Sequence, residues 1–321
     1  MRALVTGGAG FIGSHLAEHL VRCGWSVVAI DDLSTGSADN LAHLAGSEAF
    51  RLIVGSVTDR PTVARVMDDV DVVFHLAAAV GVRLIIERPI HTLQTNLLGT
   101  EVVLEVASQR GQRVVLTSTS EVYGKTERTP FREDDDLVLG PTAKSRWSYA
   151  CSKAIDEFLG FAYGRERSLP VVITRLFNTI GPRQTGAYGM VVPTLVRQAL
   201  AGEAMTVFGD GSQARCFTWV GDVVRVLADL ATHRDAPGRI FNVGGTEETS
   251  IGELATNIRL LTNSSSEIVL IPYAEAYEAG FEDMQRRVPD VSRLGDFLGY
   301  RPSMPLTEML KRIIEDMRSC G

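Results

Sequence analysis

The sequence predicts an α/β fold, a doubly wound parallel sheet followed by a smaller C-terminal α/β lobe. Short runs rich in Val and Ile alternate with stretches of helical spacing in the first half of the chain, and a glycine-rich turn joins the first run to the first helix. After about residue 181 this rhythm loosens. We therefore expect a sheet domain over residues 1–180 and a lobe over 181–321. In a fold of this kind the chain can pass from one to the other more than once.

The elements follow in order. The predicted buried strands of the sheet are 3–6, 26–30, 50–54, 72–75, 113–117 and 171–176. Helical spacing over the sheet predicts helices at 11–22, 61–67, 90–108 and 149–163. In the lobe we expect strands at 205–208, 239–243 and 267–271, and helices at 191–201, 251–261 and 306–317.

Composition excludes several classes of protein. The 321 residues carry a net charge of −7 with no Lys/Arg-rich block, which argues against a nucleic-acid partner. The four cysteines lie far apart and the six histidines lack metal-site spacing, so we expect no disulfide framework and no metal. No apolar stretch approaches ~18 residues. We expect a cytoplasmic protein without a membrane span, and a solvated loop at the acidic run 133–136.

The first motif is the glycine turn between the first strand and helix. Gly7 permits a tight turn, Gly10 lets backbone N–H groups approach a pyrophosphate, and Gly13 lets the helix pack on the strand. A glycine turn without a ligand is the alternative. Asp31, at the end of the second predicted strand, favours the ligand, because its carboxylate can accept hydrogen bonds from an adenosine ribose. With Asp32 it would repel a 2′-phosphate, so the pattern favours NAD over NADP.

The second motif is Tyr149 followed four residues later by Lys153. On a helix these side chains share one face, and a nearby ammonium favours the phenolate, which lowers the pKa of the tyrosine toward that of a useful general base. A pair on a surface helix is the alternative reading. We expect Cys151, inside the motif, to be a small packing residue rather than a nucleophile.

The third motif is a run of hydroxyl groups closed by a carboxylate after the fifth strand. Thr119 can hydrogen-bond a substrate hydroxyl, and Glu121 can act as acid or base. Ligands bind at the carboxyl ends of strands in open α/β sheets. The alternative is a polar loop whose hydroxyls cap a turn.

Together the motifs resemble the extended short-chain dehydrogenase/reductases that act on nucleotide sugars, with a Rossmann-type sheet. The resemblance runs along the whole chain through motifs in the family's order: Gly7/Gly10/Gly13, Asp31 with 33–36 and 40–41, 75–78, Asn96 with 99–100, 118–124, Tyr149/Lys153, Asn178 with 181–183, and Arg215 with Phe217. Ser56 departs from the pattern, since relatives place Asp there to hold the adenine amine.

The resemblance implies a tightly held NAD, which takes a hydride from C4 of a sugar and returns it in one cycle. Tyr149 is then the base on the C4 hydroxyl, Lys153 tunes it and holds the nicotinamide ribose, and Thr119 hydrogen-bonds the same hydroxyl. The implied catalytic residues are Thr119, Ser120, Glu121, Tyr149, Lys153 and Arg215. The implied cofactor-binding residues are Gly7, Gly10, Phe11, Ile12, Gly13, Asp31, Asp32, Ser34, Leu76, Ala77, Ala78, Asn96, Tyr149 and Lys153. The implied substrate-binding residues are Thr119, Asn178, Arg183, Arg215 and Arg287. For His75 and Asn96, tying strands together is the alternative role.

Within the family, the sequence favours UDP-glucuronate decarboxylation. Decarboxylases carry Ser-Glu where this chain has Ser120-Glu121, and so does the GDP-mannose branch of the 4,6-dehydratases. Other hexose 4,6-dehydratases generally place Asp-Glu there, and epimerases usually have no carboxylate at the second position. The stretch 140–149 is similar to the decarboxylase domain of the bacterial polymyxin-resistance enzyme, and 286–290 resembles the UDP-xylose synthases. A 4-epimerase of a UDP-sugar is the second reading and an NDP-hexose 4,6-dehydratase the third. A non-enzymatic, NAD-sensing regulator on the same fold is the reading from a different class. By analogy with the family we expect a homodimer formed through helices 90–108 and 149–163.

Overall fold

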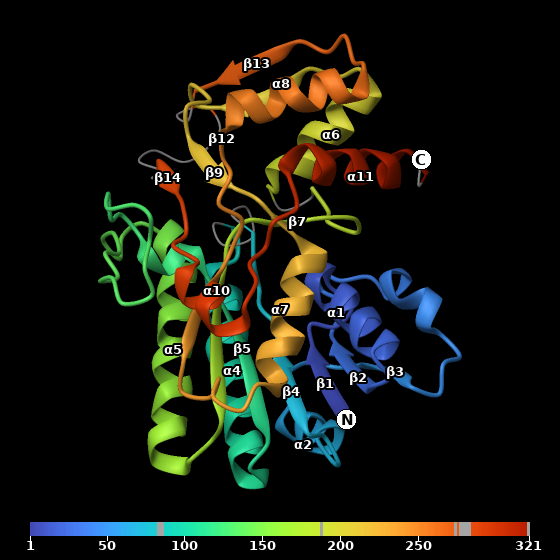
Figure 1. The fold of residues 1–321 in the computed structure, drawn as a ribbon, viewed down its shortest axis with the longest axis vertical. Coiled ribbons are helices and arrows are strands. Elements are labelled where there is room, and N and C mark those ends of the chain that lie inside the picture. Colours follow the sequence, from blue (N-terminus) through green and yellow to red (C-terminus); the bar gives the residue numbers. More distant parts are fainter. Residues whose placement is uncertain (82–86, 187–188, 273–274, 276–283, 320–321) are drawn as a thin grey trace.

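The fold is taken from a computed structural model. It describes residues 1–321 except 82–86, 187–188, 273–274, 276–283 and 320–321. Cys320 therefore lies outside the described residues. The elements described below keep the labels of Figure 1.

A parallel sheet of seven strands forms the larger part of the described chain. Its strand order is β11-β6-β5-β4-β1-β2-β3. The strands are β1 (Arg2–Thr6), β2 (Ser26–Asp31), β3 (Phe50–Val54), β4 (Val72–His75), β5 (Arg113–Thr119), β6 (Val171–Leu176) and β11 (Ile240–Val243). The strand order reverses between β1 and β4, and a crevice opens beyond the carboxyl ends of the strands at such a point.

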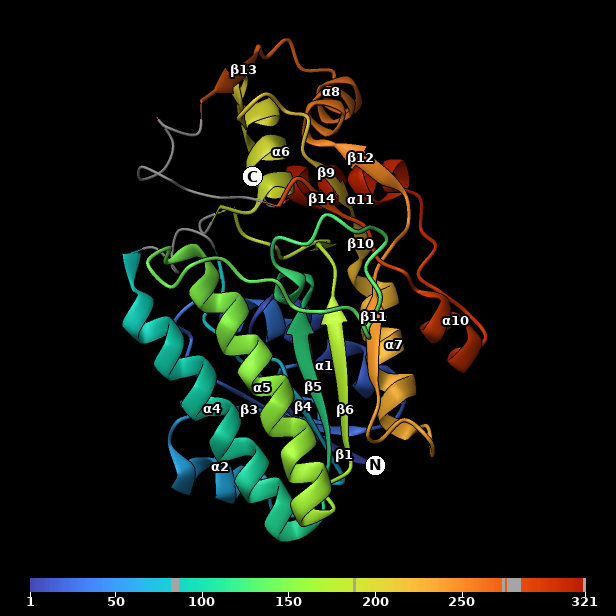
Figure 2. The same ribbon diagram turned by 90° about the vertical axis from the view of Figure 1, so that its left-hand side faces the viewer.

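Helices cover both faces of the sheet. On one face lie α1 (Phe11–Arg22), α7 (Val220–Thr232) and α10 (Ser292–Leu298), and on the other α2 (Arg60–Val66), α4 (Pro89–Arg110) and α5 (Arg146–Arg167) (Figures 1 and 2). Side chains alternate between the faces: Val115 packs in the core beneath α1 and α7, whereas Val114 and Leu116 pack beneath α2 and α4. Two 3₁₀ helices, η1 (Ala38–Leu44) and η2 (Ser120–Tyr123), follow β2 and β5.

The smaller lobe lies over the carboxyl ends of the strands (Figure 1). Its helices are α6 (Val191–Ala201), α8 (Ile251–Thr262) and α11 (Leu306–Ser319). They enclose a separate core around Leu195, Leu254 and Leu310. Its short strands are β7 (Thr179–Ile180), β8 (Met205–Phe208), β9 (Ala214–Cys216), β10 (Thr218–Trp219), β12 (Glu248–Ser250), β13 (Ile268–Ile271) and β14 (Arg286–Arg287). Three of these strands form a small sheet in which β14 and β12 flank β9.

The structure differs from the sequence-based expectations at several points. The strand expected in the lobe at 239–243 instead pairs with β6 at the edge of the large sheet. The strand expected to be buried at 50–54 is the opposite edge, where Val54 is 65% exposed. The acidic run 133–136 is only partly solvated: Glu133 is buried and its Oε1 accepts a hydrogen bond from the Asn242 N–H at 2.9 Å. Among the described helices, none is both long and apolar enough to cross a membrane.

Candidate active site

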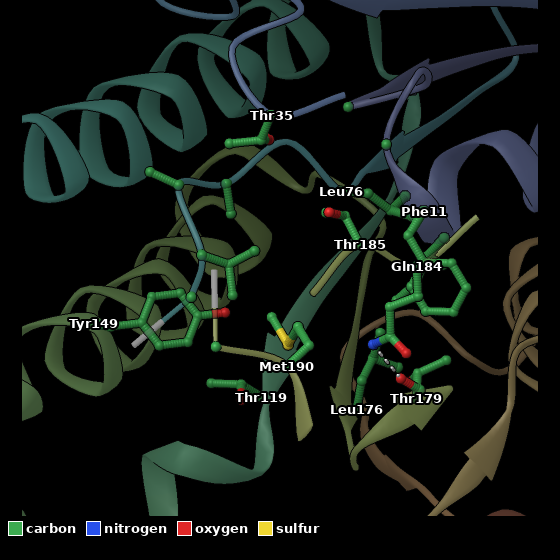
Figure 3. A pocket seen from close by; sticks show the side chains of 18 of the residues that line it. Phe11, Thr35, Leu76, Thr119, Tyr149, Leu176, Thr179, Gln184, Thr185 and Met190 are labelled. Carbon is green, nitrogen blue, oxygen red and sulfur yellow. Dashed lines mark hydrogen bonds between the residues drawn. The ribbon is translucent and has the colours of Figure 1, made fainter. Parts of the chain in front are cut away.

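A cavity of about 1090 Å³ lies between the carboxyl edge of the sheet and the lobe. Every residue that the sequence proposed as catalytic, cofactor-binding or substrate-binding lines this cavity, with the exception of Asn96. Figure 3 shows the Tyr149 hydroxyl pointing into it, with Thr119 and Met190 nearby and Phe11 and Leu76 across from it. Residues separated by more than a hundred positions therefore share one site.

The glycine loop closes the sheet end of this cavity. Gly7 has φ +66°, a conformation that L side chains rarely adopt. A Cβ at position 13 would lie 2.1 Å from the Gly7 carbonyl oxygen, so α1 can approach the loop this closely only with glycine there. The helix then begins at Phe11 with its first backbone N–H groups directed at the cavity, the arrangement that binds phosphate groups.

Asp31 ends β2 beside the same loop. Its carboxylate accepts hydrogen bonds from the Ala9 N–H at 2.9 Å and the Leu33 N–H at 2.8 Å. Burial raises the pKa of this carboxyl, Asp32 adds to the rise, and the backbone N–H groups oppose it. The carboxylate is thus fixed at the rim of the cavity, in the place where an adenosine ribose is held in dinucleotide-binding folds.

His75 is a structural link and not a proton carrier. The Thr6 hydroxyl lies 2.8 Å from its Nδ1 and the Thr100 hydroxyl 3.1 Å from its Nε2. Burial, with the Lys153 charge in addition, lowers the pKa of His75 to about 3. The ring is therefore neutral at physiological pH and ties β1 and β4 to α4.

Asn96, expected to contact a cofactor, does not line the cavity. Asn96 is 1% exposed, and its Oδ1 accepts a hydrogen bond from the Ala79 N–H at 2.8 Å. Its Nδ2 donates to the Ser152 hydroxyl at 3.1 Å. The amide is thus satisfied by the loop after β4 and by α5, and it shapes the wall of the cavity from behind.

Tyr149 lies on the first turn of α5, where it faces Thr119 at the end of β5. Burial raises the pKa of Tyr149, and so do the negative charges of Glu121 and Asp156. Arg146 and the hydrogen bond with Thr119 lower it. The Lys153 charge does not offset burial, so this structure does not show the lowered pKa that was expected of the pair.

The reason lies in the partner that Lys153 has. Its ammonium group donates to the Asp156 carboxylate at 2.8 Å, one turn along α5. The paired charges largely cancel at the distance of the phenol. A second expectation on this helix is wrong: Cys151 is exposed and not packed, because its position faces away from the sheet.

Glu121 lies between two arginines at the inner end of the cavity. Arg146 Nη1 contacts its Oε2 at 2.5 Å, and Arg287 Nη1 contacts its Oε1 at 3.3 Å. Burial raises the pKa of Glu121, but Arg146, Arg287 and Arg215 outweigh burial and bring it to about 2. The carboxylate is ionised at neutral pH, so the expected role of Glu121 as an acid does not fit this geometry.

Arg146 is a functional residue that sequence reasoning did not assign. It lies three residues before Tyr149 and therefore on the same face of α5 as the phenol, a spacing that could have revealed it. The side chain is 3% exposed to solvent, an unusual burial for arginine. Its guanidinium charge is balanced by the carboxylate of Glu121.

The two other arginines of this cluster come from the lobe. Parallel pairing of β14 with β9 sets Arg287 opposite Arg215. Arg215 Nη1 donates to the carbonyls of Ala214 at 2.9 Å and Gln285 at 3.2 Å, which holds its guanidinium group in place. We call Arg146, Arg215, Arg287 and Glu121 the arginine cluster. Its formal charges sum to +2, which suits an anionic ligand.

The two remaining predicted substrate residues lie closer to β7 and α1. Asn178 Nδ2 donates to the Cys216 carbonyl at 2.9 Å and so joins β9 to the end of β6. Arg183 Nη2 pairs with Glu18 of α1 at 2.6 Å, beside the helix that follows the glycine loop. Arg183 therefore lies on the side of the cavity formed by the sheet domain.

The site thus combines a phosphate-binding helix start, a fixed carboxylate for a ribose, a buried phenol with a hydroxyl partner, and a cationic cluster. The glycine loop leaves no room for a Cβ at positions 7 and 13 and, together with Asp31, has the donor and acceptor groups that suit a dinucleotide. A phenol that takes a proton next to such a cofactor supports oxidation of a secondary alcohol. The cationic cluster supports binding of a carboxylate or phosphate.

Comparisons with known proteins agree with this geometry. Residues 4–313 match the family described as GDP-mannose 4,6 dehydratase. The chain is 42% identical over 318 residues to the UDP-N-acetyl-alpha-D-glucosaminuronate decarboxylase of Bacillus cytotoxicus, an alignment covering 99% of this chain and 98% of that relative. It is 38% identical over 314 residues to UDP-glucuronic acid decarboxylase 1 of Danio rerio, covering 98% of this chain and 72% of that relative.

Solved structures place it in the same group. The UDP-glucuronic acid 4-epimerase of Bacillus cereus, crystallised with UDP-glucuronic acid and NAD, has a TM-score of 0.90 to this chain at 27% identity, with 100% of both chains covered. The chain therefore belongs to the GDP-mannose 4,6 dehydratase family, among the extended short-chain dehydrogenase/reductases that modify nucleotide sugars.

Proposed function

We propose that this protein is an NAD-dependent decarboxylase of a UDP-linked hexuronic acid, which acts through a 4-keto intermediate. The observation that carries the proposal is the arginine cluster at the inner end of the cavity, next to Tyr149. A net charge of +2 beside the reacting phenol suits a sugar that itself bears a carboxylate. The relatives in Bacillus cytotoxicus and Danio rerio, each aligned over nearly the whole of this chain, are named as decarboxylases of such sugars.

The first step is oxidation at C4 of the sugar. The glycine loop and Asp31 hold NAD, which accepts a hydride when bound. Tyr149 takes the proton of the C4 hydroxyl, and Thr119, within hydrogen-bond reach of the phenol, orients that hydroxyl. Lys153 lies one turn along α5 from Tyr149 and lines the same cavity, so it can hold the nicotinamide ribose.

The second step is loss of the carboxyl group. Oxidation leaves the C6 carboxylate β to the C4 ketone, so the C5–C6 bond can break with its electron pair passing into a C4–C5 enolate, while CO₂ leaves. The enolate then takes a proton at C5. The arginine cluster can align the breaking bond with the carbonyl and stabilise the enolate oxygen. Glu121, being ionised, holds Arg146 and Arg287 in place rather than supplying the proton.

A 4-epimerase is the second candidate. The structure of the UDP-glucuronic acid 4-epimerase covers this whole chain, and epimerisation needs only Tyr149, Lys153, Thr119 and room for the keto sugar to rotate. The arginine cluster favours the decarboxylase, because ion pairs with the sugar carboxylate would hold that group in place and oppose the rotation of the keto sugar that epimerisation needs. The sugars named for the two relatives differ at C2, which carries an acetamido group in one and a hydroxyl group in the other.

Incubation of the NAD-loaded protein with a panel of UDP-, dTDP- and GDP-sugars, read by product mass, tests the proposal. UDP-glucuronate or its 2-acetamido analogue should lose CO₂ and yield a UDP-pentose or its 4-keto form. A product of unchanged mass, such as UDP-galacturonate, would establish the epimerase in its place. Bound NAD without turnover on any sugar would support the regulatory protein.

We propose further that two copies associate through α4 and α5. These helices lie side by side on an outer face of the molecule (Figure 2). They expose large apolar side chains: Ile90 is 72% exposed, Leu98 47%, Ile155 41% and Phe158 68%. A twofold dimer would bury this self-complementary stripe. Sedimentation analysis should show a dimer that Phe158→Glu converts to a monomer, whereas Leu260→Glu, an equally exposed position on α8, should leave it intact.

A further inference from the structure

A buried ion pair lies on α5, one to two turns beyond the reacting phenol. Lys153 is 3% exposed and Asp156 is fully buried, and their Nζ and Oδ2 atoms lie 2.8 Å apart. Burying two charges costs free energy of desolvation, which their mutual attraction offsets only when the geometry is good. Nothing in the proposed chemistry requires a carboxylate at this position.

A hydrogen-bonded chain fixes Asp156 to the sheet. The Thr6 hydroxyl accepts the N–H groups of Leu76 and Ala77, each at 3.1 Å, so its own proton points to Nδ1 of His75. The neutral His75 ring then carries its proton on Nε2 and donates it to Thr100.

The hydroxyl proton of Thr100 is thereby left for the carboxylate of Asp156, whose pKa it lowers. The same pKa is raised by burial and lowered by Lys153. The chain of contacts thus runs from the end of β1, where the glycine loop starts, to the ammonium of Lys153.

We propose that Asp156 is a positioning residue of this active site: it holds the Lys153 ammonium in place and, by pairing with it, determines how much of that positive charge acts on Tyr149. The proposal rests on the proposed function for the role of Tyr149 alone. Asp156 does not line the cavity, yet under this proposal it influences the Tyr149 phenol, which starts the reaction.

The charges around Tyr149 define what Asp156 contributes. Glu121 from η2 and Asp156 from α5 disfavour the phenolate, while Arg146 from α5 favours it. Lys153 acts on the phenol together with its partner, so the two charges oppose one another. Removing the carboxylate charge should leave the ammonium uncompensated and favour the phenolate.

Two other nearby ionisable groups do not change this balance. His75 is neutral, and Glu157 is occupied by Arg175 in a separate buried pair with an O–N distance of 2.8 Å. Asp156 is therefore the carboxylate whose neutralisation frees the Lys153 charge.

The experiment is a titration of the phenolate in NAD-saturated protein. The near-ultraviolet absorbance of each variant is compared with that of the same variant carrying Tyr149→Phe, so that the difference reports Tyr149 alone. Asp156→Asn should shift this titration, and the acidic limb of the kcat–pH profile, to lower pH by about one unit. Asp156→Glu, which keeps the charge, should leave the titration near its original position.

An unchanged or upward-shifted titration in folded Asp156→Asn protein would overturn the proposal. Should that variant fail to fold, Thr100→Val and Thr100→Ser decide the matter. Thr100→Val removes the hydroxyl that stabilises the Asp156 charge and should shift the Tyr149 titration to lower pH by less than Asp156→Asn does. Thr100→Ser keeps the hydroxyl and should give no shift. Equal titrations in the two variants would overturn the proposal. Because the phenolate is read without a sugar, absence of turnover on every uronate would refute the proposed function and leave this result intact.

Discussion

The two ends of the cavity are built in different ways. At the cofactor end the surface is mostly backbone: the glycine loop, the start of α1 and the loop after β4 pack so closely that a Cβ at position 7 or 13 would clash with backbone atoms. At the substrate end the surface is made by charged side chains brought from η2, α5, β9 and β14. The first end comes from two stretches of sequence, and the second is assembled from four.

This difference distinguishes the cofactor-binding backbone, which we expect all members of the family to need, from the side chains that select the reaction of one member. Backbone that cradles a dinucleotide leaves little freedom for variation, because a Cβ at position 13 collides with Gly7. A cluster of arginines around one carboxylate can change by single substitutions. We therefore expect changes at the cofactor end to affect every reaction of the fold, and changes at the arginine cluster to affect the choice of reaction.

The largest effect is expected where the two ends meet, at Tyr149. Tyr149→Phe keeps the ring but cannot accept the C4 proton, so kcat should fall by about 10²–10⁴-fold. The amount of bound NAD and the affinity for the sugar nucleotide should change little. Near-normal turnover, measured by product formation under saturating substrate, would show that the phenol is not the base.

At the substrate end, Arg287→Gln should lower kcat for decarboxylation by about 10²–10³-fold, as loss of one preorganised cationic donor does. Arg286→Gln is the matched control, because Arg286 is the exposed neighbour that pairs with Glu248 at 2.8 Å outside the cavity. Equal rates for the two variants would contradict the assignment of the arginine cluster.

Glu121→Gln should have a smaller effect at the same end. Without the shared carboxylate, Arg146 and Arg287 lose their common anchor, and we expect decarboxylation to slow by about 10–100-fold. Bound NAD, measured after acid release from the purified protein, should stay at the wild-type level. A loss of NAD as large as the loss of rate would mean that Glu121 supports the fold and not the reaction.

The cofactor end is tested by Asp31→Ala, which should weaken NAD binding by about tenfold through loss of hydrogen bonds to a charged acceptor. NADP binding should weaken less, so the preference for NAD should shrink. Asp32→Ala, at an exposed neighbouring carboxylate, should have the smaller effect of the two. A wild-type protein that prefers NADP would refute the role assigned to Asp31.

The smallest effect concerns stability. The pKa of His75 is about 3 in the folded protein against 6.5 for the free side chain, so below pH 6.5 the unfolded chain binds a proton that the folded protein excludes. The free energy of unfolding should therefore fall by about 1.4 kcal/mol per pH unit as pH drops from 6 toward 4 through this group. His75→Asn should cost stability at pH 7 but flatten that slope in urea titrations. An identical slope in both proteins would place the pH dependence elsewhere.

The same comparison explains what could be predicted from the sequence. The glycine loop, Asp31 and the Tyr149–Lys153 pair are local patterns, so their positions in the cavity followed from spacing and strand order. The contacts of Arg146 and Asn96 depend on partners distant in sequence: a carboxylate 25 residues earlier in one case, a loop and a helix in the other. The four-residue strand β11 returns to the sheet after the first part of the lobe, and no local pattern marks that return.

The central claim is that the arginine cluster directs a uronate toward loss of its carboxyl group. UDP-glucuronate labelled isotopically at C6, incubated with the NAD-loaded protein and followed by carbon NMR, tests this most directly. The account predicts that the label appears as CO₂ and bicarbonate, with a UDP-pentose or UDP-4-keto-pentose left unlabelled. A label retained in UDP-galacturonate would contradict it.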